Sequence, residues 1–479
     1  MRKYLKSILF LWLVALLIYR FLICFSYKPE ITNGESNNIW KAINVASGKN
    51  LYNDPEKLPL EVFQYNPLSE ISIIAFANFF DNKNPFYIHH ITIAGRCYQL
   101  LCSILLAIIL FKLSNKLLNI NKTSSIIISL TAISFLTPTA FTIRPDATVL
   151  VFIFLSIYSF TRYLEFKKVK WLLLTCLFIA LSFLTKQDGL FILFPFGLYL
   201  LLYERWKSVI YFSITVILSI IVTLLFLHFT FGDIYWINTF KGLKNTMSLH
   251  QLIAVFDRAN TFFGFFILTG LILSIYHLTK RNQKLKLLSI IYLLYILISL
   301  LISTKIGSWV NYYTPNVILT IILVFGTLHN SSLQNNTSLN LLVRFYLVLS
   351  SMVYLSLQCY NYTLPFLKST KHEYIKAYQD FNLLNKRLPL TKNDFIFVPT
   401  PLLRNFYATN NCMVNTEYYH QASFTYDIIK KDKKNKLKYI IFKENERFIV
   451  NDIVSFFSID LKLYELNKLN EFIVYSRKS

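Results

Sequence analysis

Three short polar segments interrupt long apolar stretches of the sequence, and their residue types could bind an anionic ligand. The segments are "TIRPD" (142–146), "TKQDG" (185–189) and "KIGSWVNYY" (305–313). Each contains one cation, namely Arg144, Lys186 or Lys305, beside side chains that form hydrogen bonds. Fixed cations stabilise negative charge best where water is excluded. The segments can form a single site only if the intervening elements bring them to one side of the protein.

Composition indicates that most of these intervening elements lie in a membrane. The 479 residues are 54% hydrophobic and 17% aromatic, with a mean hydropathy of +0.45, which exceeds what a soluble core requires. The net charge of +24 would also suit a nucleic-acid-binding protein, but in a membrane protein the position of each charge is more informative than the sum. We therefore expect an integral membrane protein that contacts lipid and no nucleic acid.

The apolar stretches predict a bundle of about eleven transmembrane helices, each long enough or nearly long enough to span a bilayer. They lie at 8–25, 91–110, 125–141, 148–164, 171–184, 190–203, 209–229, 262–276, 287–303, 314–328 and 341–357. The first stretch follows Arg2, Lys3 and Lys6, as a signal peptide would, but it is long and no small-residue cleavage site follows it. This favours a membrane span. Arg20 lies late in this span, where its side chain is expected to extend outward to the interface.

The basic residues predict the orientation of the bundle. Alternate connections contain basic clusters at 2–6, 112–122, 162–170, 205–207 and 280–286. The positive-inside rule places these connections, and the N-terminus, in the cytoplasm. The remaining connections therefore face outward, including the long segment 26–90, the three polar segments and the chain after residue 358. We expect all three polar segments at one membrane surface.

Each polar segment also has a structural interpretation. Lys186 and Lys305 could extend their ammonium groups to the interface from helix ends. Pro145 and Asp146 suit the first turn of a helix, because a proline lacks the N–H that is unused there and the helix dipole favours an acidic residue. Trp309 and its neighbouring tyrosines suit an interfacial aromatic belt. Three such clusters on the same side favour a shared site.

The C-terminal region differs in character from the apolar bundle. Short β-rich runs, "FIFVP" (395–399), "KYIIF" (438–442) and "EFIVYS" (471–476), alternate with polar stretches. This pattern predicts a small α/β domain. We therefore divide the chain into a membrane domain, 1–362, whose first outer loop is 26–90, and an outer soluble domain, 363–479.

The first outer loop contains a short amphipathic helix. Apolar residues recur at helical spacing between residues 35 and 47, which suits a helix lying at the membrane interface. Thr32 and Glu35 have the spacing of a capping box, so one interpretation makes Glu35 only a helix cap. The segments "SGKNLYNDP" (47–55) and "YNPL" (65–68) follow as turns or extended chain.

The order of these motifs resembles bacterial membrane glycosyltransferases of the GT-C superfamily, related to protein O-mannosyltransferases and aminoarabinose transferases. The resemblance rests on the first span, an acidic residue in the outer loop, and the segments "SGKNLYNDP", "YNPL", "AGR" (94–96), "RPD" (144–146), "TKQDG" and "KIGSWVNYY". It covers about residues 1–330, and the C-terminal domain is similar in placement only.

The resemblance implies transfer of a hexose or pentose from a polyprenyl-phosphate donor, with inversion, at the outer face of a bacterial inner membrane. The acceptor could be a glycolipid, a polysaccharide or a protein. Such families place a catalytic carboxylate in the first outer loop, and Glu35 is the matching position. Many members have an aspartate, often next to a second acidic residue, whereas this chain has "NGE" at 33–35, which leaves Glu30 as a rival.

The same resemblance assigns the remaining site residues. A carboxylate at Glu35 would accept the proton of the acceptor hydroxyl as a general base. The candidate donor-phosphate ligands are Lys186, Arg144, Lys305 and Arg96. The candidate substrate contacts are Asp146, Gln187, Asn311 and Tyr65. Asp146 could also orient Arg144.

The sequence gives less support to a metal cofactor, a transporter or a membrane scaffold. No loop contains a convincing set of metal ligands, so no cofactor is expected and the sequence does not support a divalent metal. A transporter or lipid flippase is the alternative function, but it would carry ionisable groups near the bilayer midplane, whereas most charges here lie at helix ends. A membrane scaffold gives no reason for polar clusters in three short loops. The sugar transferase is therefore the leading hypothesis.

Overall fold

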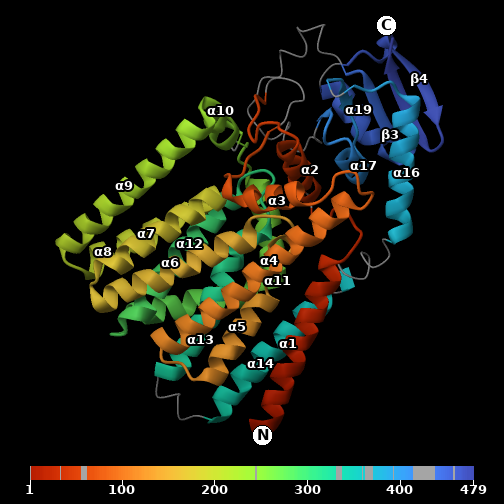
Figure 1. Cartoon of the computed structure of the whole chain (residues 1–479). Coiled ribbons are helices and arrows are strands. Elements are labelled where there is room, and N and C mark those ends of the chain that lie inside the picture. The colour runs from red at the N-terminus through yellow and green to blue at the C-terminus, as the bar shows by residue number, and fades with distance from the viewer. Residues whose placement is uncertain are drawn as a thin grey trace. The chain divides into compact units, whose positions relative to one another are not determined.

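The computed structural model describes residues 2–32, 34–55, 62–242, 245–330, 337–358, 360–361, 370–391, 393–413, 437–456 and 459–478. Most of these residues are helical (Figure 1). The chain folds as two units, each made of separate stretches of sequence. Unit 1 contains Met1–Cys24, Arg96–Phe226 and Met247–Pro365, and unit 2 contains Phe25–Gly95, Leu227–Thr246 and Phe366–Ser479.

Long apolar helices build unit 1, and two of them, α4 and α9, also contribute residues to unit 2. The helices are α1 (Arg2–Cys24), α4 (Tyr87–Lys112), α5 (Lys122–Ser134), α6 (Asp146–Phe166), α7 (Val169–Thr185), α8 (Leu193–Tyr203), α9 (Trp206–Phe231), α11 (Leu249–Leu278), α12 (Gln283–Ser303), α13 (Thr314–Asn330) and α14 (Thr337–Gln358). Every apolar stretch predicted as a span overlaps one of them. Within the described residues, eight helices are long and apolar enough to cross a membrane, whereas α7 and α8 are shorter. The expected total of eleven spans stays a prediction.

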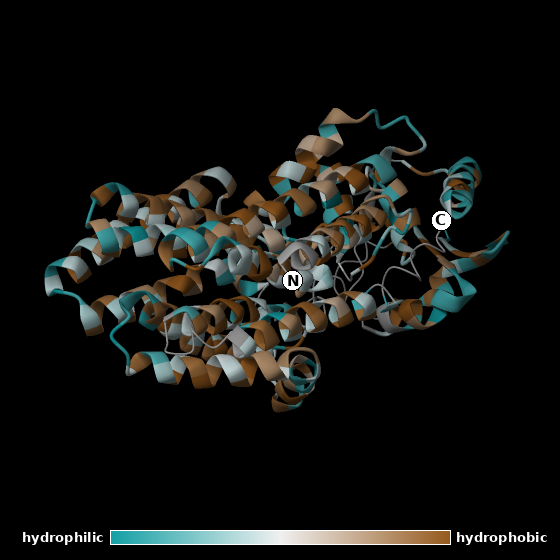
Figure 2. Ribbon diagram, turned by 90° about the horizontal axis from the view of Figure 1, so that it is seen from below, coloured by the Kyte–Doolittle hydropathy of each residue, from teal (hydrophilic) through white to brown (hydrophobic). Residues whose placement is uncertain are grey.

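The outer faces of these helices are apolar, as a lipid environment requires. Only 17% of the residues in the apolar stretch of α9 that is long enough to cross a membrane are buried. Ile210, Ile214 and Leu218 recur every four residues along this helix, and all three are exposed. Figure 2 shows that hydrophobic residues dominate the long helices, while hydrophilic residues gather at connections and ends. Such exposed rows would be unfavourable in water and match the hydrocarbon of a bilayer.

Arg20 departs from its expected outward orientation. Its side chain is 1% exposed. Nη2 donates a hydrogen bond to the Ile133 carbonyl at 3.1 Å, and the guanidinium lies 3.9 Å from the centre of the Phe141 ring. The prediction that Arg20 reaches the interface is therefore wrong, because α1 turns this residue toward α5 and the segment that follows it.

Unit 2 combines helices with one small sheet. Its helices are α2 (Glu35–Ala46), α3 (Leu68–Phe79), α10 (Asp233–Trp236), α16 (Lys371–Arg387), α17 (Pro401–Phe406) and α19 (Arg447–Phe456). Its strands are β1 (Phe395–Phe397), β2 (Asn411–Met413), β3 (Tyr439–Lys443), β4 (Tyr464–Leu469) and β5 (Phe472–Arg477). The sheet order is β2-β1-β3-β5-β4. Figure 1 shows the sheet at the C-terminal end of the chain, with α16, α17 and α19 around it.

The sheet mixes parallel and antiparallel pairs. β1 is parallel to β2 and β3, whereas β5 is antiparallel to β3 and β4. The turn between β4 and β5 places Asn470 at φ 53°, a conformation that asparagine tolerates better than most residues. The buried hydrophobic core of the sheet includes Phe397, Ile440, Phe442 and Val450. The three β-rich runs predicted from the sequence are thus confirmed as β1, β3 and β5.

Candidate active site

The three polar segments meet in unit 1, where each interrupts or begins a helix. Pro145 disfavours a helical conformation at the residue before it, so α6 begins at Asp146. α7 ends at Thr185, Lys186 is extended with φ −156° and ψ 138°, and a 3-10 turn follows at Gln187–Ile192. The third segment forms another 3-10 turn at Val310–Tyr313. These breaks turn polar side chains away from the helix axis and toward one another.

Gly189 allows the first of these turns to fold back closely on α7. A Cβ atom at this position would lie 2.7 Å from the backbone carbonyl carbon and oxygen of Ser182. No side chain fits at such a distance without movement of the backbone. The glycine therefore fixes the approach of Lys186 and Asp188 to the rest of the cluster.

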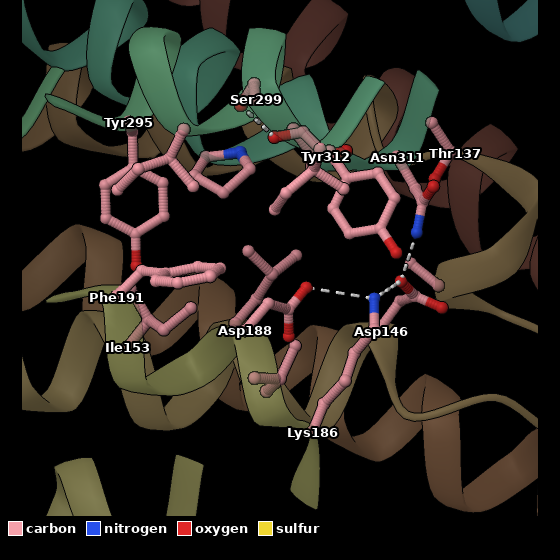
Figure 3. Close-up of a pocket in the computed structure, with 17 residues that line it drawn as sticks. Thr137, Asp146, Ile153, Lys186, Asp188, Phe191, Tyr295, Ser299, Asn311 and Tyr312 are labelled. Carbon is pink, nitrogen blue, oxygen red and sulfur yellow. Dashed lines mark hydrogen bonds and ion pairs between the residues drawn. The ribbon is translucent and has the colours of Figure 1, made fainter. Parts of the chain in front are cut away.

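Lys186 is the centre of a buried ionic cluster. Its ammonium nitrogen, Nζ, donates to Asp146 Oδ1 at 3.2 Å and lies 3.1 Å from Asp188 Oδ2 (Figure 3). The same nitrogen lies 4.6 Å from the centre of the Tyr312 ring. Two carboxylates and the face of an aromatic ring thus surround one cation, which explains how a lysine is accommodated between apolar helices.

Asp146 links all three segments. Its Oδ1 also accepts a hydrogen bond of 2.6 Å from Asn311 Nδ2, and its Oδ2 lies 3.6 Å from Arg144 Nε. Figure 3 shows Asn311 and Lys186 approaching this carboxylate from opposite elements. Asp146 is therefore in a position to orient Arg144, as expected from the sequence, and it holds Lys186 and Asn311 as well.

Lys305 adds a third cation near this cluster. Burial, together with repulsion from the Lys186 ammonium, lowers the pKa of Lys305 to about 8, and Asp188 opposes that change. Gly307, in the loop after Lys305, has φ 87°, a conformation that favours glycine. Near neutral pH, three cations and two carboxylates give the cluster a charge of about +1.

A cavity of about 40 Å³ lies beside the cluster. Asp146, Lys186 and Asn311 line it with apolar and aromatic side chains, Phe191 and Tyr295 among them. This volume holds a few water molecules but no sugar. The Tyr295 hydroxyl and Asp188 Oδ1 are buried here without a hydrogen-bond partner in the described part of the chain. The cavity therefore offers polar groups to a small ligand or to part of a larger one.

Three participants were not singled out from the sequence, namely Asp188, Tyr312 and Tyr295. Asp188 lies within "TKQDG", so the sequence did show an acidic residue near Lys186. Side chains two residues apart in a helix point in different directions, however, so their pairing was not expected. Conversely, four of the predicted unit 1 residues do not line the cavity, namely Gln187, Arg96, Arg144 and Lys305. Arg96 is buried in α4, and its Nη1 donates to the Ile23 carbonyl at 3.2 Å.

Glu35 and Tyr65 belong to unit 2, whereas the other seven predicted site residues belong to unit 1. Glu35 is completely buried, and its Oε2 accepts a hydrogen bond of 2.9 Å from the Ile31 backbone nitrogen. α2 begins at Glu35 after Gly34, so Glu35 is not at the third helical position that a capping box with Thr32 requires.

Glu30 and Tyr65 make other contacts within unit 2. Glu30 Oε1 accepts a hydrogen bond of 2.7 Å from the Gly34 backbone nitrogen. Burial raises the pKa of the Glu30 carboxyl, and the nearby Arg404 guanidinium opposes this rise. The Tyr65 carbonyl accepts a hydrogen bond from the Tyr52 hydroxyl at 2.8 Å. Glu30 therefore acts on the backbone at the start of α2.

Comparisons with known proteins agree with this architecture. Residues 88–230 match the family model described as dolichyl-phosphate-mannose-protein mannosyltransferase. The structure of ArnT from Cupriavidus metallidurans in the apo state is similar over 98% of each chain, with a TM-score of 0.60 and 11% identity. The same protein bound to undecaprenyl phosphate gives a TM-score of 0.58, again with 11% identity and 98% coverage of each chain. The chain has a GT-C glycosyltransferase fold.

A second solved protein shares this fold. The Archaeoglobus fulgidus oligosaccharyltransferase, in complex with zinc and sulfate, has a TM-score of 0.54 and 12% identity over 97% of this chain and 73% of that one. A search of curated sequences found no match. The predicted resemblance to GT-C enzymes is confirmed, as is the helical membrane fold with a small C-terminal sheet. The family match and the fold together support a membrane glycosyltransferase.

Proposed function

We propose that this protein transfers a sugar, a hexose or a pentose, from a polyprenyl-phosphate donor to an acceptor at the outer face of the membrane. The observation that carries the proposal is the similarity along almost the whole chain to ArnT, a protein also solved with undecaprenyl phosphate, together with the mannosyltransferase family match at 88–230. We further propose that the membrane domain, 1–362, has its N-terminus in the cytoplasm and that the domain 363–479 lies outside.

The ionic cluster of unit 1 supports a site for the donor phosphate. A sugar joined to a lipid through a phosphodiester carries one negative charge, and a second charge develops as the sugar leaves. The positive charges of Lys186, Arg144 and Lys305 exceed the negative charges of Asp146 and Asp188 by about one unit. These three cations would stabilise the departing phosphate. Arg96 remains a fourth candidate, and Asp146, Gln187, Asn311 and Tyr65 remain candidate contacts to the substrate.

Glu35 is the proposed general base. As the acceptor oxygen bonds to the anomeric carbon, the Glu35 carboxylate takes the hydroxyl proton and the bond from carbon to the phosphate oxygen breaks. Attack opposite the leaving group inverts the anomeric configuration. Glu35 is buried, so the proposal requires that substrate binding exposes its carboxylate. Glu30 remains the rival base, because its Oε1 binds the Gly34 N–H much as Glu35 Oε2 binds the Ile31 N–H.

The chemistry on this route is proton transfer and charge stabilisation by side chains. Within the described ranges, no group of three His, Cys, Asp or Glu side chains could hold a metal ion. We therefore assign no step to a metal, and the assay should include divalent ions and a chelator.

A transfer assay tests the proposal. Purified protein in liposomes would be given a panel of labelled polyprenyl-phosphate sugars and an envelope extract as acceptor. We expect transfer from one donor, and Glu35→Gln should reduce its rate about 10²- to 10⁴-fold. The matched control is Glu465→Gln, which removes an exposed carboxylate from β4. Absence of transfer by folded wild-type protein from every donor would contradict the function, and full activity of Glu35→Gln would contradict the base.

A further inference from the structure

One buried arginine of the C-terminal region reaches the start of α2 within unit 2. Arg404, on α17, is 2% exposed. Its Nη2 donates to Ser36 Oγ at 2.7 Å and to Asn37 Oδ1 at 2.6 Å. These two acceptors directly follow Glu35 in the first turn of α2. A guanidinium from residues far along the chain therefore fixes the turn that carries Glu35.

The helix dipole alone does not favour a cation at this end of α2. The N-terminus of a helix carries partial positive charge, so an arginine there is unfavourable unless negative groups compensate. Here Glu30 and Glu35 lie at the same helix start, and the Arg404 charge acts on the Glu30 carboxyl. Both hydrogen bonds come from one nitrogen, Nη2, and reach two adjacent side chains, so together they hold the guanidinium against this turn. The arrangement thus favours geometric control of this turn.

We propose that Arg404 is a positioning residue for Glu35, through which the C-terminal region holds the base in place during sugar transfer. This inference rests on the proposed function, because it takes Glu35 as the base. A misplacement of about 1 Å in a catalytic group can cost on the order of 10²-fold in rate. The C-terminal region would then act on turnover itself, in addition to any contact with the acceptor.

A second contact between the α2 region and the α17 region provides a matched control, because it joins the same two segments without reaching the turn that carries Glu35. Lys49 Nζ, just beyond the C-terminal end of α2, donates to the Asn410 carbonyl at 2.7 Å, and Asn410 lies shortly after α17. Lys49 and Arg404 therefore join the same parts of the chain at opposite ends of α2. Loss of general docking would affect both variants, whereas loss of Glu35 positioning would affect only the variant at Arg404.

The decisive experiment compares the transfer kinetics of Arg404→Met, Arg404→Lys and Lys49→Met in the full chain. For Arg404→Met we expect kcat to fall at least tenfold, with KM for donor and acceptor changed less than twofold. Arg404→Lys keeps the charge but not the planar guanidinium, so its kcat should lie between wild type and Arg404→Met. Lys49→Met should keep the wild-type kcat. Equal effects at Arg404 and Lys49, or an effect on KM alone, would overturn the inference.

A second variant covers the case in which Arg404→Met does not fold. Replacing both acceptors, Ser36→Ala with Asn37→Ala, leaves Arg404 in place but removes its two hydrogen bonds. We expect this pair to lower kcat at least tenfold, and an unchanged kcat would overturn the inference. If wild-type protein transfers no sugar at all, the proposed function fails first. If wild type transfers sugar and both sets of variants keep its kcat, only the role of Arg404 fails.

Discussion

Replacing Lys186 by methionine separates the structural role of this residue from its proposed role in donor binding. The side chains of Asp146 and Asp188 are 8% and 22% exposed, so neither carboxylate can be fully hydrated when the ammonium group is lost. Asp146 would keep Asn311 at 2.6 Å and Arg144 at 3.6 Å. Asp188, whose Oδ1 already lacks a hydrogen-bond partner, would lose its ion pair with Lys186. We therefore expect the cost to arise mainly at Asp188.

Breaking a buried ion pair from one side costs about 3–5 kcal/mol, and we take about 3 kcal/mol because Asp146 retains two partners. This lowers the ratio of folded to unfolded protein roughly 100-fold. The double variant Lys186→Met with Asp188→Asn removes the uncompensated carboxylate as well. It should recover most of the lost stability, and Asp188→Asn alone should have a smaller effect because Lys186 keeps Asp146.

The assay measures both quantities on the same purified samples. Thermal unfolding in detergent should rank wild type and Asp188→Asn highest, the double variant next and Lys186→Met lowest. Sugar transfer should remain low in the double variant, because the proposed phosphate contact is still missing. If Lys186→Met is as stable as wild type, or the double variant is no more stable than the single one, the reasoning about buried charge is wrong. If the double variant regains transfer, Lys186 serves charge compensation and does not bind the donor.

Three further predictions concern other parts of the structure. Lys305 is charged below pH 8 and loses its charge as the pH rises through its lowered pKa of about 8. The donor KM should therefore increase above pH 8 in wild type but not in Lys305→Arg. Parallel pH profiles of KM in the two proteins would contradict this. Gly189→Ala should sharply reduce the yield of folded protein, because its Cβ would lie 2.7 Å from the Ser182 carbonyl. The control Gly197→Ala, whose Cβ would have nothing within 4 Å, should match wild type. Size-exclusion chromatography measures the folded yield of both variants. Glu30→Gln should retain sugar transfer at least tenfold better than Glu35→Gln, and the reverse order would make Glu30 the base.

The sequence predicted elements whose signals are local. The apolar stretches became helices, and the β-rich runs became β1, β3 and β5, because each depends on a few consecutive residues. β2 and β4 were not predicted. β2 has only three residues, and β4, "YELNKL", is mostly exposed, so neither shows the apolar pattern of a buried strand. β2 takes its place in the sheet by pairing with β1, as Cys412 does with Ile396, and β4 by pairing with β5, as Leu466 does with Tyr475. Composition does not encode either register.

The candidate site shows the same division between local and distant information. Cations and an acidic residue in three segments predicted to face outward indicated that these segments could converge, and in unit 1 they do. The partnership of Lys186 with Asp188 was not predictable by helical spacing, because residues two apart do not face each other on a helix. It exists because Lys186 is extended and a 3-10 turn begins at Gln187, and that turn depends on the close packing of Gly189 against Ser182.

The ionic cluster has the features that a stable site for the proposed anionic donor would need. If Lys186 had no carboxylate partners, a buried ammonium would be unstable before the donor arrived. If all its cations were fully paired, the site would have no excess charge to attract a phosphate. Asp146 and Asp188 meet the first requirement for Lys186, and Lys305, the third cation against two carboxylates, meets the second. Because the pKa of Lys305 is about 8, the excess charge falls as the pH rises above that value, so donor affinity and the titration of this one lysine should change together.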